Sequence, residues 1–230
     1  MILKNNEQVT EIINKAIKDM LIDDELSDDL LNILTDVRLY SHSLEVARYS
    51  VCLGVDFSFP EDKLINLAKG ALLHDLGKKF INELILYKPG KFTDAEFQLV
   101  KQHPQLGYNY IKNKTTNKYI LEAIQEHHEN IEGTGYPKRI LEKKQVVQII
   151  TVSDIFSALT EARVYKKAMP ASRAFEILEN HNGVVQEIVQ RLKLLVYDEY
   201  EAYSQVNKCV KFFREWLPIR IQRKTKYDFE

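Results

Sequence analysis

The segment from Val146 to Leu159 is apolar on almost every side of a helix, and it constrains the fold more than any other part of the chain. A helix that is apolar all round has no face to give to water, so it belongs at the centre of a bundle. Asp154 shares a face of this helix with Val147 and Ile150. A carboxylate buried there is costly unless a cation or hydrogen-bond donors satisfy it. The segment therefore predicts a central helix that carries one buried acid with a partner.

The rest of the chain also follows the helical period, with no run of alternating apolar and polar residues that would indicate a strand. In residues 1–40 the apolar side chains of Ile12, Ile13 and Ile17 recur at helical spacing, and Ser27 is a candidate cap for a second helix. The sequence contains no internal repeat and no low-complexity segment. The pattern predicts an all-α fold.

Composition excludes several classes of partner. The net charge is -1 over 230 residues, so bulk attraction to a nucleic acid polymer or to an anionic membrane is not expected. The N-terminus lacks the charged and then apolar layout of a signal peptide, and no apolar run reaches the roughly 18 residues needed to span a bilayer. The two cysteines, Cys52 and Cys209, are far apart in the sequence, which argues against a disulfide scaffold. We therefore expect a cytoplasmic protein without a membrane span.

A His-Asp pair continues the inner face of one predicted helix. Pro60 is well placed to begin this helix, His74 and Asp75 lie on its apolar face, and Gly77 ends it. Burying an imidazole beside a carboxylate is costly unless both are satisfied. A bound metal ion would satisfy both, and a hydrogen-bonded His-Asp pair would do so equally well, so both interpretations stay open at this point.

Two further histidines lie on predicted helices. His42 falls in the first turn of a helix that begins at Ser41, where a single histidine is more often structural than a metal ligand. His103 faces inward on a helix that begins with a capping box at residues 93–96 and runs to Ile111.

The adjacent His127 and His128 end another apolar helical run and lead into a Gly-Thr-Gly-Tyr-Pro turn at residues 133–137. Imidazole is the commonest transition-metal ligand, and glycine lets the backbone come close to a metal ion or a phosphate. An exposed helix end followed by an ordinary loop would give the same local pattern. The sixth histidine, His181, is expected at an exposed helix end.

Five histidines and two inward-facing aspartates supply enough nitrogen and oxygen ligands for two metal ions that share a carboxylate. Mixed imidazole and carboxylate ligation suits Fe, Mn, Zn or Co better than Ca or Mg alone. Pairs of metal ions a few Å apart are a common solution for phosphoester hydrolysis.

Several short motifs follow one another between residues 38 and 182. They are His42, His74-Asp75-Leu76-Gly77-Lys78, Lys88-Pro89-Gly90-Lys91-Phe92-Thr93, His103-Pro104-Gln105-Leu106-Gly107, the stretch at 127–137, and Asp154 followed by Ala158-Leu159 and Arg163-Val164-Tyr165-Lys166. A lone His-Asp dipeptide would say little. This ordered set resembles that of the HD-GYP domain, a subgroup of the HD-domain metal-dependent phosphohydrolases.

The resemblance implies a fold and an activity. The fold is a compact multi-helix HD-domain bundle, with an N-terminal helical segment at 1–37, the HD-GYP catalytic domain at 38–182 and a C-terminal helical extension at 183–230. The activity is that of a metal-dependent phosphodiesterase in bacterial second-messenger signalling. It would hydrolyse cyclic di-GMP to linear pGpG, to GMP or to both, through a hydroxide that two metal ions activate. The terminal helices would be available to a second copy of the chain or to a signalling protein.

The resemblance also assigns roles to residues. It implies two divalent transition-metal ions, with Fe or Mn expected first and Zn, Co or Ni as further candidates. Their ligands would be His42, His74, Asp75, His103, His127, His128 and Asp154, with Asp75 as the bridge. The catalytic residues would be Asp75, Lys78 and His103. The substrate contacts would be Lys78, Tyr136, Arg163 and Lys166.

Three positions depart from the family pattern. Arg38 stands where some members have a glutamate that holds a third metal ion, so we predict two ions here. Glu132 replaces the usual aspartate of the signature loop, the stretch at 127–137, and Ser157 stands where aspartate is common. Two alternatives stay open: an HD phosphohydrolase that acts on another cyclic or non-cyclic nucleotide, and a weakly active signalling or scaffold protein that works through partners.

Overall fold

The computed structural model describes residues 2–161 and 168–198, and the named elements of regular structure in these ranges are helices. In order they are α1 (Ile2–Ile22), α2 (Ser27–Thr35), α3 (Val37–Asp56), α4 (Glu61–Leu73), the 3-10 helix η1 (Leu76–Phe80), α5 (Glu83–Leu86), α6 (Asp94–Val100), α7 (His103–Ile111), α8 (Lys118–Glu126), α9 (Gln145–Thr160), α10 (Ala171–Glu179) and α11 (Gln186–Asp198). The predicted all-α fold is confirmed. Among the described residues, no helix is both long and apolar enough to cross a membrane.

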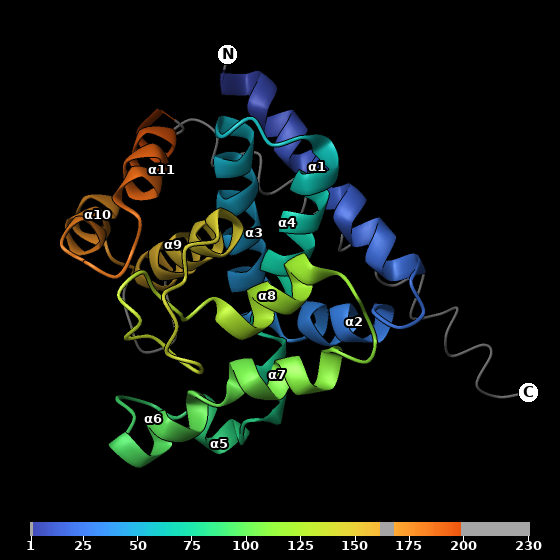
Figure 1. Cartoon of the computed structure of the whole chain (residues 1–230), viewed down its shortest axis with the longest axis vertical. Coiled ribbons are helices and arrows are strands. Elements are labelled where there is room, and N and C mark those ends of the chain that lie inside the picture. The colour runs from blue at the N-terminus through green and yellow to red at the C-terminus, as the bar shows by residue number, and fades with distance from the viewer. Residues whose placement is uncertain (1, 162–167, 199–230) are drawn as a thin grey trace, which may run out of the picture.

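Helix α9 lies at the centre of the bundle, as the sequence predicts. It packs against α3, α8, α10 and α11, and Figure 1 shows it, in yellow, between the pair α3–α4 and the pair α10–α11. Val147, Ile149, Ile150 and Val152 are fully buried. Because apolar side chains cover almost all of its circumference, burial on every side is the arrangement that keeps them from water.

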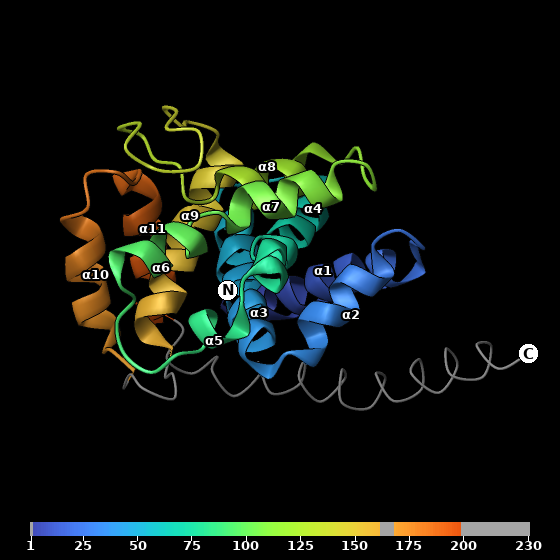
Figure 2. The same cartoon turned by 90° about the horizontal axis from the view of Figure 1, so that it is seen from below.

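The remaining helices pack mainly on the partners of α9 and on one another. Helices α1, α3 and α4 pack on one another, and α8 joins α4 to α7. Figure 2 shows α10 and α11 at one side of the molecule and α1 and α2 at the other. One hydrophobic core cluster runs through the bundle, from Val9 in α1 to Leu192 in α11. The predicted domain boundaries at residues 37 and 182 stay a prediction.

The single helix predicted for residues 94–111 is wrong, because the structure breaks it into α6 and α7. Helix α6 ends at Val100 and α7 begins at His103, directly before Pro104. Proline has no N–H and clashes with the preceding turn inside a helix, but it fits the first turn well. The break puts His103 at the first position of α7.

The predicted helix caps have mixed outcomes. The capping box is confirmed: the Thr93 hydroxyl accepts from the N–H of Glu96 at 3.3 Å, and the Glu96 carboxylate accepts from the N–H of Thr93 at 2.7 Å. The predicted cap at Ser27 is wrong, because no side chain caps α2 at its N-cap residue Leu26. The carboxylate of Asp23, in the preceding turn, accepts from the N–H of Leu26 at 3.3 Å instead.

Two helix boundaries differ from the prediction. Helix α3 begins at Val37, so His42 lies in its second turn rather than its first. Helix α4 ends at Leu73, not at Gly77, and Asp75 is the N-cap residue of η1. The 3-10 helix that follows brings Gly77 close to the backbone of His103 at the start of α7.

Candidate metal centre

The seven side chains that the sequence proposes as ligands meet at one place in the bundle. They come from α3, the α4–η1 junction, the start of α7, the end of α8, and α9. Three groups among them have ligand atoms within 4.8 Å of one another, close enough to hold a metal ion: His103, His127 and His128; His42, His74 and Asp75; and His74, His127 and Asp154. All of these residues except His128 are buried.

The Asp75 carboxylate lies between two pairs of imidazoles. Its Oδ2 atom is 3.4 Å from Nε2 of His74 and 3.7 Å from Nε2 of His42. Its Oδ1 atom is 3.3 Å from Nε2 of His103 and 3.9 Å from Nε2 of His127. A carboxylate whose two oxygens face separate sets of ligands has the arrangement that a bridging ligand needs.

Asp154 has imidazoles as partners inside the apolar helix α9. Its Oδ1 atom is 2.9 Å from Nε2 of His42 and 3.9 Å from Nε2 of His74. Its Oδ2 atom is 4.0 Å from Nδ1 of His128. The buried acid predicted from the sequence therefore has the partners that its burial requires.

Backbone carbonyls orient three of the imidazoles. The Nδ1 atoms of His74, His103 and His127 lie 2.7, 2.8 and 2.8 Å from carbonyl oxygens three or four residues earlier in the chain. Because a carbonyl can only accept, Nδ1 carries the donated proton and Nε2 is left facing Asp75. Metal-binding histidines are commonly held in this way by the other ring nitrogen.

A side chain orients His42 instead. Its Nδ1 atom lies 3.0 Å from the hydroxyl of Ser157. Ser157 stands where aspartate is common in HD-GYP domains, so a neutral hydroxyl here makes the contact with the ring. The sequence marked Ser157 only as a departure from the pattern, and its contact with His42 follows from the packing of α9 against α3.

Nearby charges keep both acids ionised. Burial disfavours the charged form of Asp75, but Lys78 and His74 oppose burial and hold the pKa of Asp75 well below its usual range. Burial acts in the same sense on Asp154, and its contact with His42 and the charge of His74 lower its pKa below the usual range. Both are therefore carboxylates at neutral pH, the form that binds cations.

The imidazoles differ in their affinity for protons. Burial lowers the pKa of His127 well below its usual value, and partial burial of His128 lowers its pKa to about 3. Burial also disfavours protonation of His74, but the charges of Asp75 and Asp154 outweigh it and raise the pKa of His74. A metal ligand must be a neutral imidazole. His127 and His128 are already in that form, and a cation beside His74 would replace its proton.

One buried atom in the cluster has no hydrogen-bond partner among the described residues: Nε2 of His74. It faces Asp75 and Asp154 at 3.4 and 3.9 Å without the alignment of a hydrogen bond. Leaving such an atom unpaired costs about 1–3 kcal/mol, a cost that coordination would remove. Imidazoles combined with carboxylates suit divalent transition-metal ions. The residues present therefore fit such ions.

Two glycines bring Asp75 and His103 together. A Cβ atom on Gly77 would lie 1.8 Å from the carbonyl oxygen of His103, and one on Gly107 would lie 3.0 Å from the backbone nitrogen of Gly77. Both distances are shorter than the roughly 3.5–4.0 Å at which non-bonded heavy atoms pack best. Only glycine at these positions lets η1 pack against the start of α7, which sets Asp75 beside His103.

The structure describes two of the four predicted substrate contacts. The Lys78 amino group contacts Oδ2 of Asp75 at the edge of the cluster. The Tyr136 ring stacks on the His128 ring, with centroids 4.5 Å apart and planes at 27°. The other two predicted contacts lie outside the described residues: Arg163 and Lys166.

Glu129 and Asn130 hold the signature loop in place. Glu129 is fully buried, and its carboxylate accepts from the backbone N–H groups of residues 138–140 at 2.5, 3.0 and 3.1 Å. Oδ1 of Asn130 accepts from the N–H groups of residues 132 and 134 at 3.1 and 3.0 Å. Neither residue was predicted to have a role, although their place directly after the two histidines was an available signal.

Gly135 allows this loop to lie against the histidine–aspartate cluster. A Cβ atom at Gly135 would lie 2.3 Å from the carbonyl oxygen of His128, so a larger residue would push the loop outward. The close approach carries the next residue, Tyr136, over the His128 ring.

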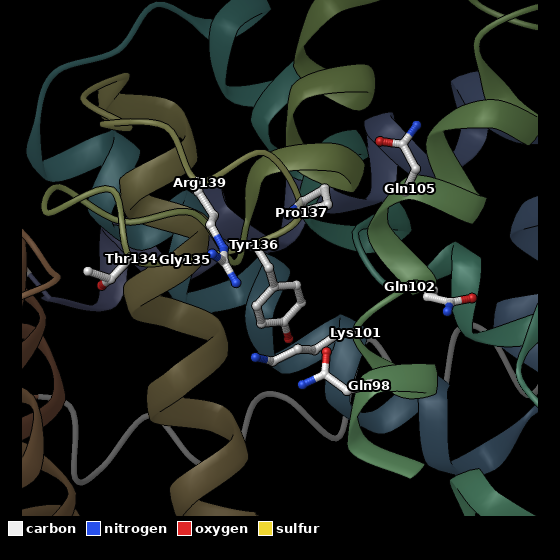
Figure 3. A pocket seen from close by; sticks show the side chains of 9 residues that line it. All are labelled: Gln98, Lys101, Gln102, Gln105, Thr134, Gly135, Tyr136, Pro137 and Arg139. Carbon is white, nitrogen blue, oxygen red and sulfur yellow. The ribbon is translucent and has the colours of Figure 1, made fainter. Parts of the chain in front are cut away.

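A pocket of about 330 Å³ opens beside the cluster, between α6–α7 and the signature loop (Figure 3). One wall carries Gln98, Lys101, Gln102 and Gln105, and the other carries residues 134–137 and 139. The sequence analysis did not find this pocket.

Comparison with known proteins places these features in a family. A model of the HD domain family matches residues 6–186. The chain is 33% identical over 174 residues to the cyclic di-GMP phosphodiesterase PA4108 of Pseudomonas aeruginosa. The aligned region covers 70% of this chain and 42% of that protein. It is 35% identical over 166 residues to the 3'3'-cGAMP-specific phosphodiesterase 3 of Vibrio cholerae. That aligned region covers 69% of this chain and 36% of that protein. The chain thus spans less than half the length of these two relatives.

A solved structure shares the fold. Bd1817, a HDG"Y"P protein from Bdellovibrio bacteriovorus, superposes with a TM-score of 0.58 at 20% identity, over 84% of this chain and 68% of that one. The helical architecture is therefore common to both proteins. Since the family model also matches most of the sequence, the chain belongs to the HD domain family.

Proposed function

We propose that this chain is a metal-dependent phosphodiesterase of the HD-GYP type that hydrolyses cyclic di-GMP to linear pGpG, GMP or both. The observation that carries the proposal is the Asp75 carboxylate, whose two oxygens face two separate pairs of imidazoles. A site built around one shared carboxylate suits two metal ions, and paired metal ions are a recurrent device for phosphate ester hydrolysis. The names of the two relatives support a cyclic dinucleotide as the substrate.

We assign the candidate ligands to two groups that share Asp75. One group would consist of Oδ2 of Asp75 together with His42, His74 and Asp154. The other group would consist of Oδ1 of Asp75 together with His103, His127 and His128. Divalent ions held there would act as Lewis acids toward a phosphate oxygen and lower the pKa of a bound water. Fe and Mn are proposed first, with Zn, Co and Ni as further candidates, because such ligand sets accept several ions.

The chain's own residues bind and orient the substrate. The Lys78 ammonium, held beside Asp75 at the edge of the cluster, can donate a charge-assisted hydrogen bond to a phosphate oxygen. Tyr136 covers His128 and shapes the entrance to the site. We propose His103 as a third catalytic residue beside Asp75 and Lys78. Two further phosphate contacts are proposed outside the described residues: Arg163 and Lys166.

The cluster is organised before substrate arrives. Backbone carbonyls fix three imidazoles, and burial keeps bulk water from the carboxylates. Groups held in place in this way need little reorganisation during the reaction, which is the largest contribution of many active sites to rate.

A second candidate substrate is 3'3'-cGAMP, because one relative at 35% identity is named for it. The two cyclic dinucleotides share the phosphodiester ring and differ in a base, so the metal cluster by itself would not separate them. A weakly active chain that works through protein partners is the remaining alternative, with the terminal segments as its surface. We keep the cytoplasm as the proposed compartment, and 1–37, 38–182 and 183–230 as the proposed divisions of the chain.

Turnover by metal-loaded protein tests the proposal. The protein would be purified without oxygen, loaded with Fe or Mn, and incubated with cyclic di-GMP or 3'3'-cGAMP, with products separated by chromatography against pGpG and GMP standards. We expect hydrolysis by the wild type and none by His74→Ala. His181→Ala is the matched control, because His181 is an exposed histidine and its loss should leave turnover unchanged.

Two results would count against the proposal. Wild-type protein that holds both ions and hydrolyses neither substrate would contradict the function. Turnover that survives His74→Ala at the wild-type rate would contradict the site.

A further inference from the structure

We infer that the pocket between α6–α7 and the signature loop is a second anion subsite, which holds the phosphate and sugar of the nucleotide adjoining the scissile phosphate. The inference rests on the proposed function and concerns its substrate. With such a subsite, the chain would select a dinucleotide over a phosphodiester that carries a single phosphate.

The polar lining of the pocket suits an anion. Lys101 and Arg139 supply two positive charges, and Gln98, Gln102 and Gln105 supply amide groups. None of the residues that line the pocket is acidic. Guanidinium and ammonium groups on facing walls are typical of sites for phosphate groups.

The two cations have no acid partner within residues 2–161 and 168–198. The Lys101 amino group instead lies 5.2 Å from the centroid of the Tyr136 ring. Figure 3 shows the side chains of Lys101 and Arg139 on facing walls of the pocket, with Tyr136 between them. By contrast, Lys144 in the same stretch of chain contacts the carboxylate of Glu126. The pocket therefore keeps two positive charges that a ligand can neutralise.

The pocket adjoins the metal cluster through one residue. Tyr136 lines the pocket and also stacks on His128, at 4.5 Å between ring centroids. A ligand in the pocket and a phosphate at the cluster would thus contact the same tyrosine. A molecule that fills both places needs two anionic groups a short distance apart, which a dinucleotide has.

The size of the pocket matches part of such a ligand. Its volume of about 330 Å³ is at the lower end of the roughly 300–1,000 Å³ common for small-molecule sites. It suits one nucleotide, with the remainder of the substrate over the metal cluster.

The amides of the pocket are not equally available. Gln105 already accepts from Gln125 at 3.2 Å and donates to Asn109 at 3.0 Å, so it is held in the wall. Gln98 and Gln102 line the pocket without such contacts among the described residues. We therefore assign ligand hydrogen bonds to Gln98 and Gln102 and the charge to Lys101 and Arg139.

The test compares two substrates that differ in their second phosphate. Cyclic di-GMP and 3'3'-cGAMP carry two phosphates, whereas bis(4-nitrophenyl) phosphate carries one and reaches only the metal cluster. Lys101→Gln and Arg139→Gln should each lower kcat/KM for the cyclic dinucleotides by about tenfold relative to the small ester, mainly through KM. Lys143→Gln, which removes an exposed lysine that does not line the pocket, should leave that ratio unchanged.

A binding measurement gives a second readout. Calorimetry on metal-loaded wild type should show tighter binding of pGpG than of GMP, because only the dinucleotide reaches the pocket. Lys101→Gln and Arg139→Gln should reduce this preference. Lys101→Arg keeps the charge and should keep the preference, which separates loss of charge from a damaged fold.

The outcomes separate the inference from the proposed function. If the wild type cleaves the small ester but neither cyclic dinucleotide, the proposed function fails, and the comparison of pGpG with GMP still decides whether the subsite exists. An unchanged substrate ratio and an unchanged pGpG preference in both glutamine variants would overturn the inference. Equal loss with Lys101→Gln and Lys101→Arg would also overturn the role of charge.

Discussion

The cluster of candidate metal ligands and the neighbouring pocket are built in opposite ways. In the cluster, buried side chains from separate helices are fixed one by one: three imidazoles by backbone carbonyls, and His42 by Ser157. The pocket is lined by exposed or half-buried residues, most of them polar, and Lys101 and Arg139 have no acid partner in the described part of the chain. One residue, Tyr136, belongs to both regions.

Because of this difference, we expect the cluster to determine the rate of hydrolysis and the pocket to determine which substrate is preferred. A change in the cluster disturbs groups that depend on one another in a buried site, where unpaired charge is costly. A change in the pocket alters side chains that solvent already reaches, at little cost to the fold. We therefore expect cluster substitutions to affect metal binding and turnover, and pocket substitutions to affect which phosphodiester is preferred.

The largest expected effect is the loss of turnover in Asp75→Asn. An amide cannot offer two anionic oxygens, so both proposed metal groups lose their shared ligand, and kcat should fall by about 10³-fold. Asp29→Asn is the control for loss of a buried acid, because Asp29 is fully buried but pairs with Lys79 and Lys114. It should lose stability while the folded protein keeps its turnover per bound metal. Comparable turnover in Asp75→Asn and wild type would contradict the role of Asp75 as the shared metal ligand.

Gly77→Ala tests whether the close contact of η1 with α7 assembles the cluster. Its new methyl group would collide with the backbone of His103, and overpacking of this kind should cost about 3 kcal/mol of unfolding free energy. Gly90→Ala is the control: its φ of 92° disfavours alanine, but the added atom meets nothing within 4 Å, so about 1 kcal/mol is expected. Urea denaturation of both variants measures the difference. Equal losses would mean that the contact does not constrain the cluster.

Ser157→Ala tests the one imidazole that a side chain orients. Loss of the hydroxyl should weaken metal binding by about 10-fold to 100-fold, measured by competition with a chelating dye, and Ser157→Asp should restore it. Ser50→Ala, which removes a buried hydroxyl that has no hydrogen-bond partner among the described residues, should leave metal affinity unchanged. An alanine variant with wild-type metal affinity would show that His42 does not need Ser157.

The smallest expected effect is a change in the pH dependence of Tm, and it concerns the buried acid pair Glu126 and Glu142, which lies outside the histidine cluster. Burial and a hydrogen bond with Glu126 raise the pKa of Glu142 above its usual 4.5. A raised folded-state pKa means that stability present at low pH is lost as pH rises through that pKa. Glu142→Gln avoids this loss, so its Tm relative to wild type should increase from pH 4 to pH 8.

Glu126 should behave in the opposite way. Burial opposes its ionisation, but hydrogen bonds with Glu142 and the lysines at 138 and 144 lower its pKa to about 2. Its contribution to stability is present above pH 4.5 and is lost as pH falls through about 2. Glu126→Gln should therefore lower the Tm at pH 7. Two variants with the same pH trend would contradict the assignment of charge within the pair.

Local pattern predicted much of the fold and marked single buried polar residues, whereas the full set of seven candidate ligands came from the resemblance to the HD-GYP domain. The apolar circumference of α9 required a central position, and Thr93 and Glu96 marked the start of α6. Polar residues inside apolar helical faces, such as His74 and Asp154, stand out because burial makes them costly. These signals lie within one helix turn or one face, so no knowledge of the rest of the fold is needed.

Other features depend on contacts between distant segments. Ser157 and His42 are 115 positions apart, and nothing local to either residue indicates their contact. The close approach of Gly77 to His103 likewise joins η1 to α7, and nothing local to Gly77 indicates it. The pocket escaped prediction for another reason: Lys101 and Arg139 have the polar, exposed character of ordinary surface residues.

The most direct test of the central claim is the number of metal ions that one chain holds. Metal-free protein would be titrated with Mn²⁺ or Fe²⁺ under exclusion of oxygen, desalted, and assayed for metal and protein in the same sample. The account predicts two ions per wild-type chain at full turnover and fewer than one in Asp75→Asn, because both groups share that carboxylate. A fully active chain with a single ion, or an Asp75→Asn chain that still holds two, would contradict it.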